Sequence, residues 1–344
     1  MHIGGSNFRY SLNQNLKKKS NIEDYLYLNG RMAFKSILNK LKKRRKRKIF
    51  IPNYICESLI DVIDKKKFNI NFYNVRNNFE IELPNTKNEI ILIINFFGIK
   101  YKIPNKLKKD NIIVEDITFS FLLNDKISIK KRKNYYFFGS LRKFFNSYAI
   151  GISNLKNKNK KKSSATLDDY YFKCLAASML REEYLKRKNY IFNDEIENHY
   201  LKVFKQFESF FDDNHINFDN QNIIRTSNFK NNYVKERKIY KRNINILKKN
   251  VNKKIIFITK KYKELLIIPI FSTKKLFLIK YMKSHNIYFS NFWKTPKELI
   301  KKKLSHNLYE ELILIPNDID AKPSSLKLMS KIIKKTDEDT QVFK

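Results

Sequence analysis

The sequence predicts an α/β protein with a mainly parallel sheet in its larger N-terminal part and a smaller α+β part after it. Helical and strand-like segments alternate through the first 154 residues, which is typical of parallel strands joined by helices. The run EIILIINFFG (89–98) is almost wholly apolar, as expected of a strand buried on both faces of a parallel sheet. From about residue 165 long helical patterns replace this alternation. We therefore expect a second structural unit there.

The elements of the N-terminal part follow from their hydrophobic periodicity. Residues 31–45 place Met32, Phe34, Ile37 and Leu38 at helical spacing. The strands are short apolar runs that end in proline, glycine or a polar residue. The expected order is a helix at 31–45, a strand at 48–52, a helix at 54–65, and strands at 68–75, 89–98, 111–116, 135–140 and 149–154.

The C-terminal part is expected to be a smaller α+β unit on a connecting helix. Its helical patterns cover 168–186, 192–211, 235–251, 273–284 and 323–335, and its strand candidates cover 254–258, 264–271 and 286–293. We therefore predict a large domain at 21–234 and a small domain at 235–336. Residues 1–20 and 337–344 are expected to be tails.

Composition indicates a globular protein of a reducing compartment. Hydrophobic residues make up 42% of the chain and aromatic residues 14%, which argues against disorder. The two cysteines, Cys56 and Cys174, lie far apart, and no histidine pair has metal-ligand spacing, so neither a disulfide framework nor a metal site is expected. The longest apolar run is about half the ~20 residues of a membrane helix. The N-terminus lacks a signal-peptide core, and a soluble cytoplasmic protein is expected.

The net charge of +39 has two possible explanations. Such a value normally indicates a nucleic-acid or anionic-lipid partner. However, Lys, Asn and Ile are abundant together, and A/T-rich codons specify all three, so codon bias combined with solvated faces is the interpretation we favour. The densest runs, LKKRRKRK (41–48) and LKNKNKKKSS (155–164), carry no interleaved aromatics for base stacking. Nucleic acid is therefore expected to bind only non-specifically.

Four chemistry-bearing positions follow expected strands or open the first helix. Asp116 ends the strand IIVED, and Ser140 and Lys143 follow YYFFG. Gly30 lies where the first helix begins, and the N–H groups there can hold a phosphate. A lysine amine forms Schiff bases, and pyridoxal phosphate sites pair such a lysine with an aspartate at the pyridinium nitrogen. Bound pyridoxal 5'-phosphate would account for all four positions.

The segment order resembles the DegT/DnrJ/EryC1/StrS family of fold type I aminotransferases, which act mainly on nucleotide-linked keto sugars. The resemblance covers roughly residues 23–335 and is carried by LNGRMAF (28–34), IFIPNYICESL (49–59), INFYNV (70–75), ILIINFFGIKY (91–101), IIVEDITFSF (112–121) and FFGSLRKFF (137–145). Weaker likeness continues through 237–247, 267–293 and 312–318.

This resemblance implies a role for each site residue. Lys143 would hold the cofactor and shuttle the proton, and Asp116 would face the pyridine nitrogen. Gly30, Met32, Ala33 and Ser140 would surround the phosphate. The implied reaction transfers an amino group from a donor such as glutamate to a keto sugar for surface polysaccharides. The implied assembly is a homodimer.

The sequence also departs from the family pattern beside the cofactor. Phe119 stands where a Gln or His is usual, and Cys56 where an aromatic residue commonly stacks on the ring. Met32 replaces a phosphate-binding threonine, which leaves backbone donors there, and Ala149-Ile150-Gly151 replaces a Gly-Gly pair. An altered or inactive protein, or a basic polyanion-binding protein on the same scaffold, therefore stays an alternative.

Simpler interpretations of single residues stay open as well. In these interpretations Lys143 is one more solvated cation and Asp116 is a helix cap. Gly30 is a turn glycine, and Cys56 is a small buried hydrophobe. Two other enzyme classes are excluded. Ser140-Leu-Arg-Lys143 matches S-x-x-K, but the S-D-N and K-T-G motifs of penicillin-binding proteins are absent, and so is the G-x-G-x-x-G of a Rossmann dehydrogenase.

Overall fold

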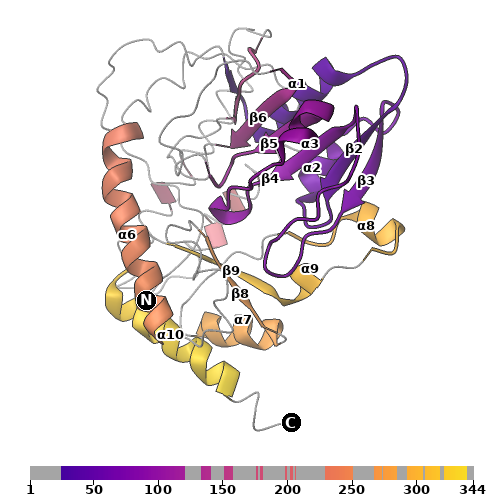
Figure 1. The fold of residues 1–344 in the computed structure, drawn as a ribbon. Helices are drawn as coiled ribbons and strands as arrows, with labels where there is room; N and C mark the ends of the chain where they lie inside the picture. The colour runs from indigo at the N-terminus through magenta and orange to yellow at the C-terminus, as the bar shows by residue number, and fades with distance from the viewer. Residues whose placement is uncertain are drawn as a thin grey trace.

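The computed structural model contains one large sheet, helices on both of its faces, and a C-terminal part built on a small second sheet (Figure 1). It describes residues 25–120, 133–140, 151–157, 229–250, 267–272, 274–284, 293–304, 307–317 and 321–338, together with a few helical residues between 176 and 206. In this part of the chain no helix is both long and apolar enough to cross a bilayer.

The large sheet has seven strands in the order β1-β7-β6-β5-β4-β2-β3. β2 to β6 are mutually parallel, whereas β7 is antiparallel to both β6 and β1. The strands are β1 (Leu26–Tyr27), β2 (Arg47–Pro52), β3 (Phe68–Tyr73), β4 (Ile90–Ile94), β5 (Ile112–Asp116), β6 (Tyr135–Ser140) and β7 (Gly151–Ser153).

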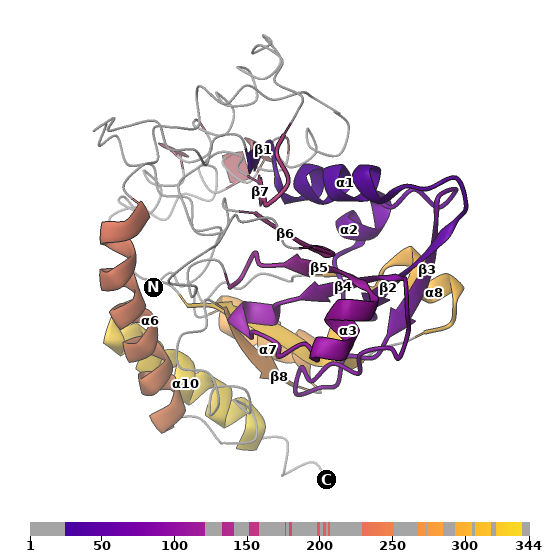
Figure 2. The same ribbon diagram turned by 45° about the horizontal axis from the view of Figure 1, so that its top comes forward.

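The central strands form the core because they are covered on both faces. Every residue of β4 is buried, and β4 pairs with β2 on one side and β5 on the other. Helix α1 (Gly30–Leu41) lies across one face with the short α2 (Glu57–Asp61), and α3 (Asn105–Asp110) lies on the other face (Figure 2). The buried side of α1 includes Phe34, whose ring stacks on Phe138 of β6 at 4.8 Å between centroids.

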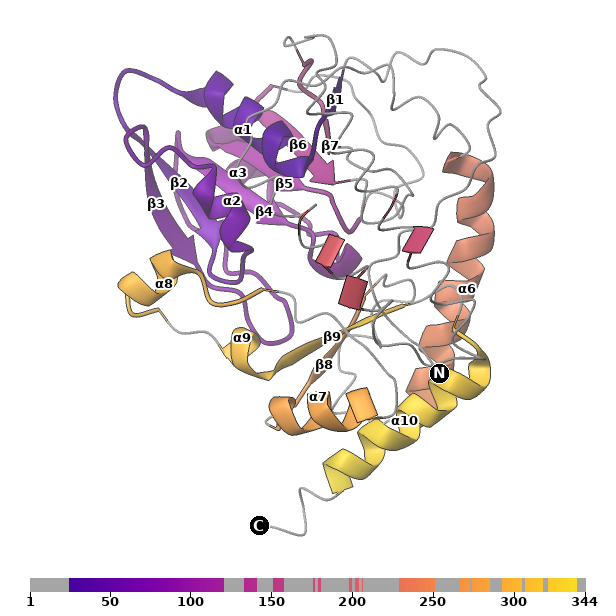
Figure 3. The ribbon, with the colours of Figure 1, turned by 180° about the vertical axis from the view of Figure 1, so that it is seen from behind.

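The C-terminal part pairs β8 (Ile267–Phe271) with β9 (Leu312–Pro316) in an antiparallel sheet. Helices α6 (Phe229–Asn250) and α10 (Pro323–Glu338) lie side by side, as Figures 1 and 3 both show. The Asn243 amide of α6 donates to Asn317 Oδ1, directly after β9, at 3.0 Å. The remaining helices are α7 (Lys275–Ser284), α8 (Lys297–Lys301) and α9 (Asn307–Glu311).

The predicted α/β architecture with a mainly parallel sheet is confirmed, and several element boundaries are corrected. The helix predicted at 54–65 is only α2, because the Asp64 carboxylate accepts the Lys66 N–H in a local turn that competes with helix. The strand predicted at 89–98 ends at Ile94, and Phe97 (φ 53°) and Gly98 (φ 102°) turn the chain away. The patterns at 168–186, 192–211, 254–258 and 286–293 lie largely outside the described residues.

Candidate active site

The first turn of α1 forms one end of the candidate site. Asn29 caps the helix: its side-chain oxygen accepts the Met32 N–H at 2.9 Å, and its backbone carbonyl accepts the Ala33 N–H at 3.1 Å. Asn29 is buried although it is polar, because both of its oxygens are used in this way. The predicted donors at Met32 and Ala33 therefore already have acceptors within the chain. Of the three predicted residues at this helix end, Gly30 is the one whose N–H group is not bound by Asn29.

Two glycines bring this helix end against the sheet. A Cβ placed on Gly30 would lie 3.1 Å from the Cβ of Ser140, so helix α1 begins against the last residue of β6. A Cβ placed on Gly151, the first residue of β7, would lie 2.0 Å from the Asn29 carbonyl oxygen, closer than any two such atoms can approach. Gly30 and Ser140, two residues predicted to surround the phosphate, are thus in contact although they lie 110 positions apart in the sequence.

Asp116 ends β5, the strand next to β6. Its carboxyl group is buried, and burial raises the pKa of Asp116 to about 6, although its Thr118 hydrogen bonds oppose this rise. One carboxylate oxygen accepts the Thr118 N–H at 2.9 Å. A buried carboxyl group whose pKa is raised by burial is suited to pair with a cationic ligand atom.

Thr118 joins Asp116 to Ser140, and sequence reasoning did not identify it. Its hydroxyl oxygen accepts the Ser140 N–H at 3.1 Å, while its own N–H is bound to Asp116. The D-x-T spacing in Asp116-Ile117-Thr118 is a known pattern for such local side-chain turns and was the available signal. The carboxylate and the phosphate-side hydroxyl are therefore held in one short chain of contacts.

The opposite face of β5 carries a second polar cluster. Glu115 points away from Asp116, since neighbouring strand residues alternate between faces. Its carboxylate accepts the Asn95 amide at 2.7 Å and the hydroxyl of Tyr135. The same Asn95 amide nitrogen donates to Ser120 at 2.8 Å, and Asn95 Oδ1 is buried with no hydrogen-bond partner among the described residues. The Asn95 side chain therefore binds on the Glu115 side, although its backbone N–H donates to the Asp116 carbonyl at 3.0 Å.

The loop after β2 brings Cys56 to the same sheet edge, and Tyr309 of α9 fixes this loop. The Tyr309 hydroxyl accepts the Ile55 N–H at 2.8 Å and lies 3.1 Å from the Asn53 carbonyl oxygen. Its ring packs 5.0 Å from that of Tyr54. The half-buried Cys56 thiol lies 3.1 Å from the Ser58 hydroxyl. No sequence pattern indicated this contact, because it joins segments more than 250 residues apart.

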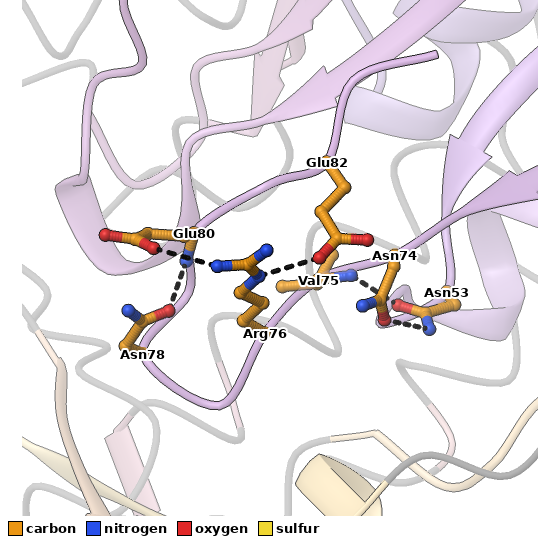
Figure 4. A network of polar contacts seen from close by, with 7 residues as sticks. All are labelled: Asn53, Asn74, Val75, Arg76, Asn78, Glu80 and Glu82. Carbon is orange, nitrogen blue, oxygen red and sulfur yellow. Dashed lines mark hydrogen bonds and ion pairs between the residues drawn. The ribbon is translucent and has the colours of Figure 1, made fainter.

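Two asparagines fix the neighbouring loops after β2 and β3 (Figure 4). Asn53 donates to Asn74 at 3.0 Å and accepts the Val75 N–H at 2.9 Å. Arg76 then pairs with Glu82 at 2.7 Å and with Glu80 at 3.8 Å. The one arginine of this loop is thus balanced by acidic neighbours.

Phe119 lies in an apolar environment near Asp116. It is buried, and its ring lies 5.7 Å from that of Phe97. Lys143 lies outside the described residues, three positions after Ser140. Within the described ranges, no group of three His, Cys, Asp or Glu side chains could hold a metal ion.

Comparison with known proteins identifies the fold. A protein from Streptococcus pneumoniae assigned as a sugar aminotransferase, solved in its PMP form, superimposes with a TM-score of 0.60 at 11% identity, over 92% of this chain and 88% of that one. An enzyme of Erwinia carotovora atroseptica assigned as a histidinol-phosphate aminotransferase gives 0.53 at 8% identity, over 92% and 81%.

A third solved structure is 8-amino-7-oxononanoate synthase of Francisella tularensis. It gives a TM-score of 0.50 at 14% identity, over 93% of this chain and 85% of that one. No protein-family model matches the sequence, and no curated protein matches it.

The chain has the α/β fold of type I pyridoxal phosphate-dependent transferases. At these identities the likeness establishes the fold and not the activity. The donor set at the carboxyl ends of the strands is compatible with such a cofactor: a helix end in contact with Ser140 for a phosphate, and a buried Asp116 for a cationic ring nitrogen.

Proposed function

We propose that this protein is a pyridoxal phosphate-dependent aminotransferase that passes an amino group to a keto sugar, with a nucleotide-linked sugar as the substrate class. The observation that carries the proposal is the contact chain from Gly30 through Ser140 and Thr118 to Asp116. A helix end suited to a phosphate and a buried carboxylate at one sheet edge support the proposal, because the cofactor's two ends need such groups. The S. pneumoniae protein, assigned as a sugar aminotransferase, supports the choice of substrate.

The phosphate end of the proposed site consists of Gly30 and Ser140. The N-terminus of the twelve-residue helix α1 attracts an anion through its dipole. Because the Met32 and Ala33 N–H groups are already bound to Asn29, we assign the phosphate to the Gly30 N–H and the Ser140 hydroxyl. Met32 and Ala33 then fix the helix end.

Asp116 is proposed to stabilise the positive charge on the cofactor's ring nitrogen. Without a cation its pKa is about 6, so part of the population is protonated at neutral pH. The buried Asp116 carboxylate would hold a cationic ring nitrogen in its protonated form, and this pairing would in turn favour the ionised state of Asp116. When bound, pyridoxal phosphate supplies an electron sink for the carbon that loses its proton.

Lys143 is the proposed attachment and proton-transfer residue. Its Nζ would hold the cofactor at rest and, once released, carry a proton from the donor carbon to the cofactor side. Cys56 and Phe119 would border the ring with an uncharged thiol and a phenyl group. Neither supplies the hydrogen bond that a Gln or His would give, so we expect a weaker hold on the ring's oxygen side. A homodimer is the proposed assembly.

The visible absorbance spectrum of purified protein, incubated with pyridoxal phosphate and then freed of unbound cofactor by gel filtration, tests this proposal. We expect an absorbance band in the visible or near-ultraviolet range, as protein-bound pyridoxal phosphate gives. Borohydride should bleach this band, and Lys143→Ala should lack it. Lys133→Ala, at the far end of β6, is the matched control and should keep the band. A colourless wild-type protein would contradict the cofactor assignment. A coloured protein inactive with keto sugars would contradict only the substrate.

A further inference from the structure

The starts of the parallel strands form a second, chemically different edge of the large sheet. β2 to β6 run in one direction with closely matched starts, so the segments before them meet at one edge, the amino edge. We define the amino edge as residues 42–48, 64–67, 87–89, 106–110 and 133. It lies at the opposite end of the strands from Asp116 and Ser140.

This edge is dominated by cations. Every residue from 42 to 48 is lysine or arginine, and Lys65, Lys66 and Lys67 precede β3. The further cations of these segments are Lys87, Lys106, Lys108, Lys109 and Lys133, and the acids are Asp64, Glu89 and Asp110.

The cations of the α1–β2 connection contact solvent. Lys43, Arg44, Arg45 and Lys46 are all exposed, and none forms an ion pair with a described residue. Of the cations in this connection, Lys42 alone pairs with a described acidic residue, Asp64, at 3.4 Å. Like charges packed this closely repel one another, so an anionic partner would lower their free energy.

Codon bias does not account for the position of these charges. A bias towards lysine acts on both ends of the same strands, yet the described segments at the carboxyl ends are balanced. There, Arg76 faces Glu80 and Glu82. The segment 117–120 after β5 and the segment 95–99 after β4 carry no charge. Within these described segments, the excess of cations is therefore larger at the amino edge than at the carboxyl ends of the strands.

The shape and chemistry of the amino edge favour a lipid surface over a nucleic acid. The cations extend across the breadth of β3, β2, β4 and β5, about 14 Å at the usual strand spacing, rather than along one groove. Among the described residues of this edge no aromatic side chain is exposed for base stacking.

Helix α8 adds apolar side chains beside these cations. It lies next to β3 in Figures 1 and 3, and its Glu298 binds Lys65 at 2.5 Å. Ile300 is 61% exposed and Leu304, three residues after the helix, is 41% exposed. Aliphatic groups gain free energy in a lipid interface but not against nucleic-acid phosphates.

We propose that the amino edge of the sheet docks on an anionic phospholipid bilayer. Each lysine or arginine near such a surface contributes attraction, and the aliphatic pair on and after α8 supplies the second contribution that stable peripheral binding needs. The candidate active site, at the other end of the strands, then faces away from the bilayer. A water-soluble substrate could reach it there. This inference does not depend on the proposed reaction.

Vesicle co-sedimentation of the full chain tests this proposal. We expect binding to vesicles of phosphatidylcholine and phosphatidylglycerol at physiological ionic strength, and none to phosphatidylcholine alone. A quadruple variant of the α1–β2 connection should weaken this binding by about tenfold or more. The substitutions are Lys43→Gln, Arg44→Gln, Arg45→Gln and Lys46→Gln.

A control variant removes the same charge from other exposed lysines. Its substitutions are Lys102→Gln, Lys322→Gln, Lys327→Gln and Lys331→Gln, and we expect vesicle binding within about twofold of wild type. Equal loss in both variants would overturn the proposal in favour of a general charge effect. Absence of wild-type binding, or preferential binding of a duplex RNA that the α1–β2 variant loses, would overturn the lipid assignment. Circular dichroism of both variants, expected to match wild type, excludes misfolding.

Discussion

The two edges of the large sheet are made from the same five parallel strands but use them differently. At the carboxyl edge, glycines, buried polar groups and aromatic rings bring distant segments into contact. At the amino edge, short connections expose lysine and arginine to solvent. Abundant lysine therefore does not decide where the candidate site of this chain lies. The deciding feature is which residues are buried against one another, and that feature predicts unequal effects of substitution at the two edges.

The largest effect is expected where the carboxyl edge is most tightly packed. Gly151→Ala would place a Cβ 2.0 Å from the Asn29 carbonyl oxygen and must displace the start of α1. We expect a loss of about 3 kcal/mol or more in unfolding free energy, measured by urea denaturation. The control Gly139→Ala meets a side-chain carbon at 3.3 Å and should cost about 1 kcal/mol. Equal losses in the two variants would show that the start of α1 can move away from Gly151 at little cost in free energy.

The second effect compares the aspartates at the two ends of β5. The pKa of Asp116 is raised to about 6, so the folded protein binds its proton more tightly than the unfolded chain does. This group therefore makes the cofactor-free protein more stable as pH falls from about 6 towards 4, by on the order of 3 kcal/mol. Asp116→Asn should remove that pH dependence from urea unfolding curves recorded at pH 5 and pH 8. Asp110→Asn at the amino edge should retain it, and an unchanged slope in Asp116→Asn would refute the assignment.

A third effect concerns the contact between α9 and the Cys56 loop. Tyr309→Phe leaves the buried Ile55 N–H without its acceptor, and we expect a loss of about 2 kcal/mol in unfolding free energy. We also expect faster alkylation of Cys56 in the folded protein, because its loop is less well held. Half-buried Tyr136→Phe serves as the control, with little change in either measurement. Unaltered Cys56 reactivity in Tyr309→Phe would mean that the loop holds its conformation without Tyr309.

The smallest effect is expected at the amino edge. Lys65→Gln removes an ion pair with Glu298 in which the lysine side chain is 56% exposed. Such a pair contributes less than about 1 kcal/mol, and salt screens it. Unfolding free energies should therefore differ by a few tenths of a kcal/mol and converge at high salt. A loss as large as that of Tyr309→Phe would remove the contrast between the edges.

Much of the fold was predictable because its core strands are nearly continuous apolar runs. Residues 111–116 and 135–140 were predicted as the strands now seen as β5 and β6. The short helices α3, α8 and α9 and the strands β1 and β9 were not predicted. The helices and β1 depend on turns and tertiary contacts more than on periodicity. The direction of β7 depends on its pairing with β6 and β1, which no local pattern reveals.

The candidate site was predicted in part for a similar reason. The order of Gly30, Asp116 and Ser140 along the chain was informative, because parallel strands bring their carboxyl ends to one edge. The structure places these three near one another, whereas the role of Lys143 stays a prediction. Thr118 and Tyr309 were not identified, because their importance lies in hydrogen bonds to backbone groups elsewhere in the chain.

In a chain rich in lysine, we propose that Lys143 alone binds the cofactor covalently. Borohydride reduction of the protein with stoichiometric pyridoxal phosphate, followed by proteolysis and mass spectrometry, tests it directly. We predict that Lys143 alone carries a pyridoxyl group. We also predict that this group is absent from Asp116→Asn and from Gly151→Ala at the same cofactor concentration. A label spread over the exposed lysines of the amino edge, with Lys143 unmodified, would contradict the account.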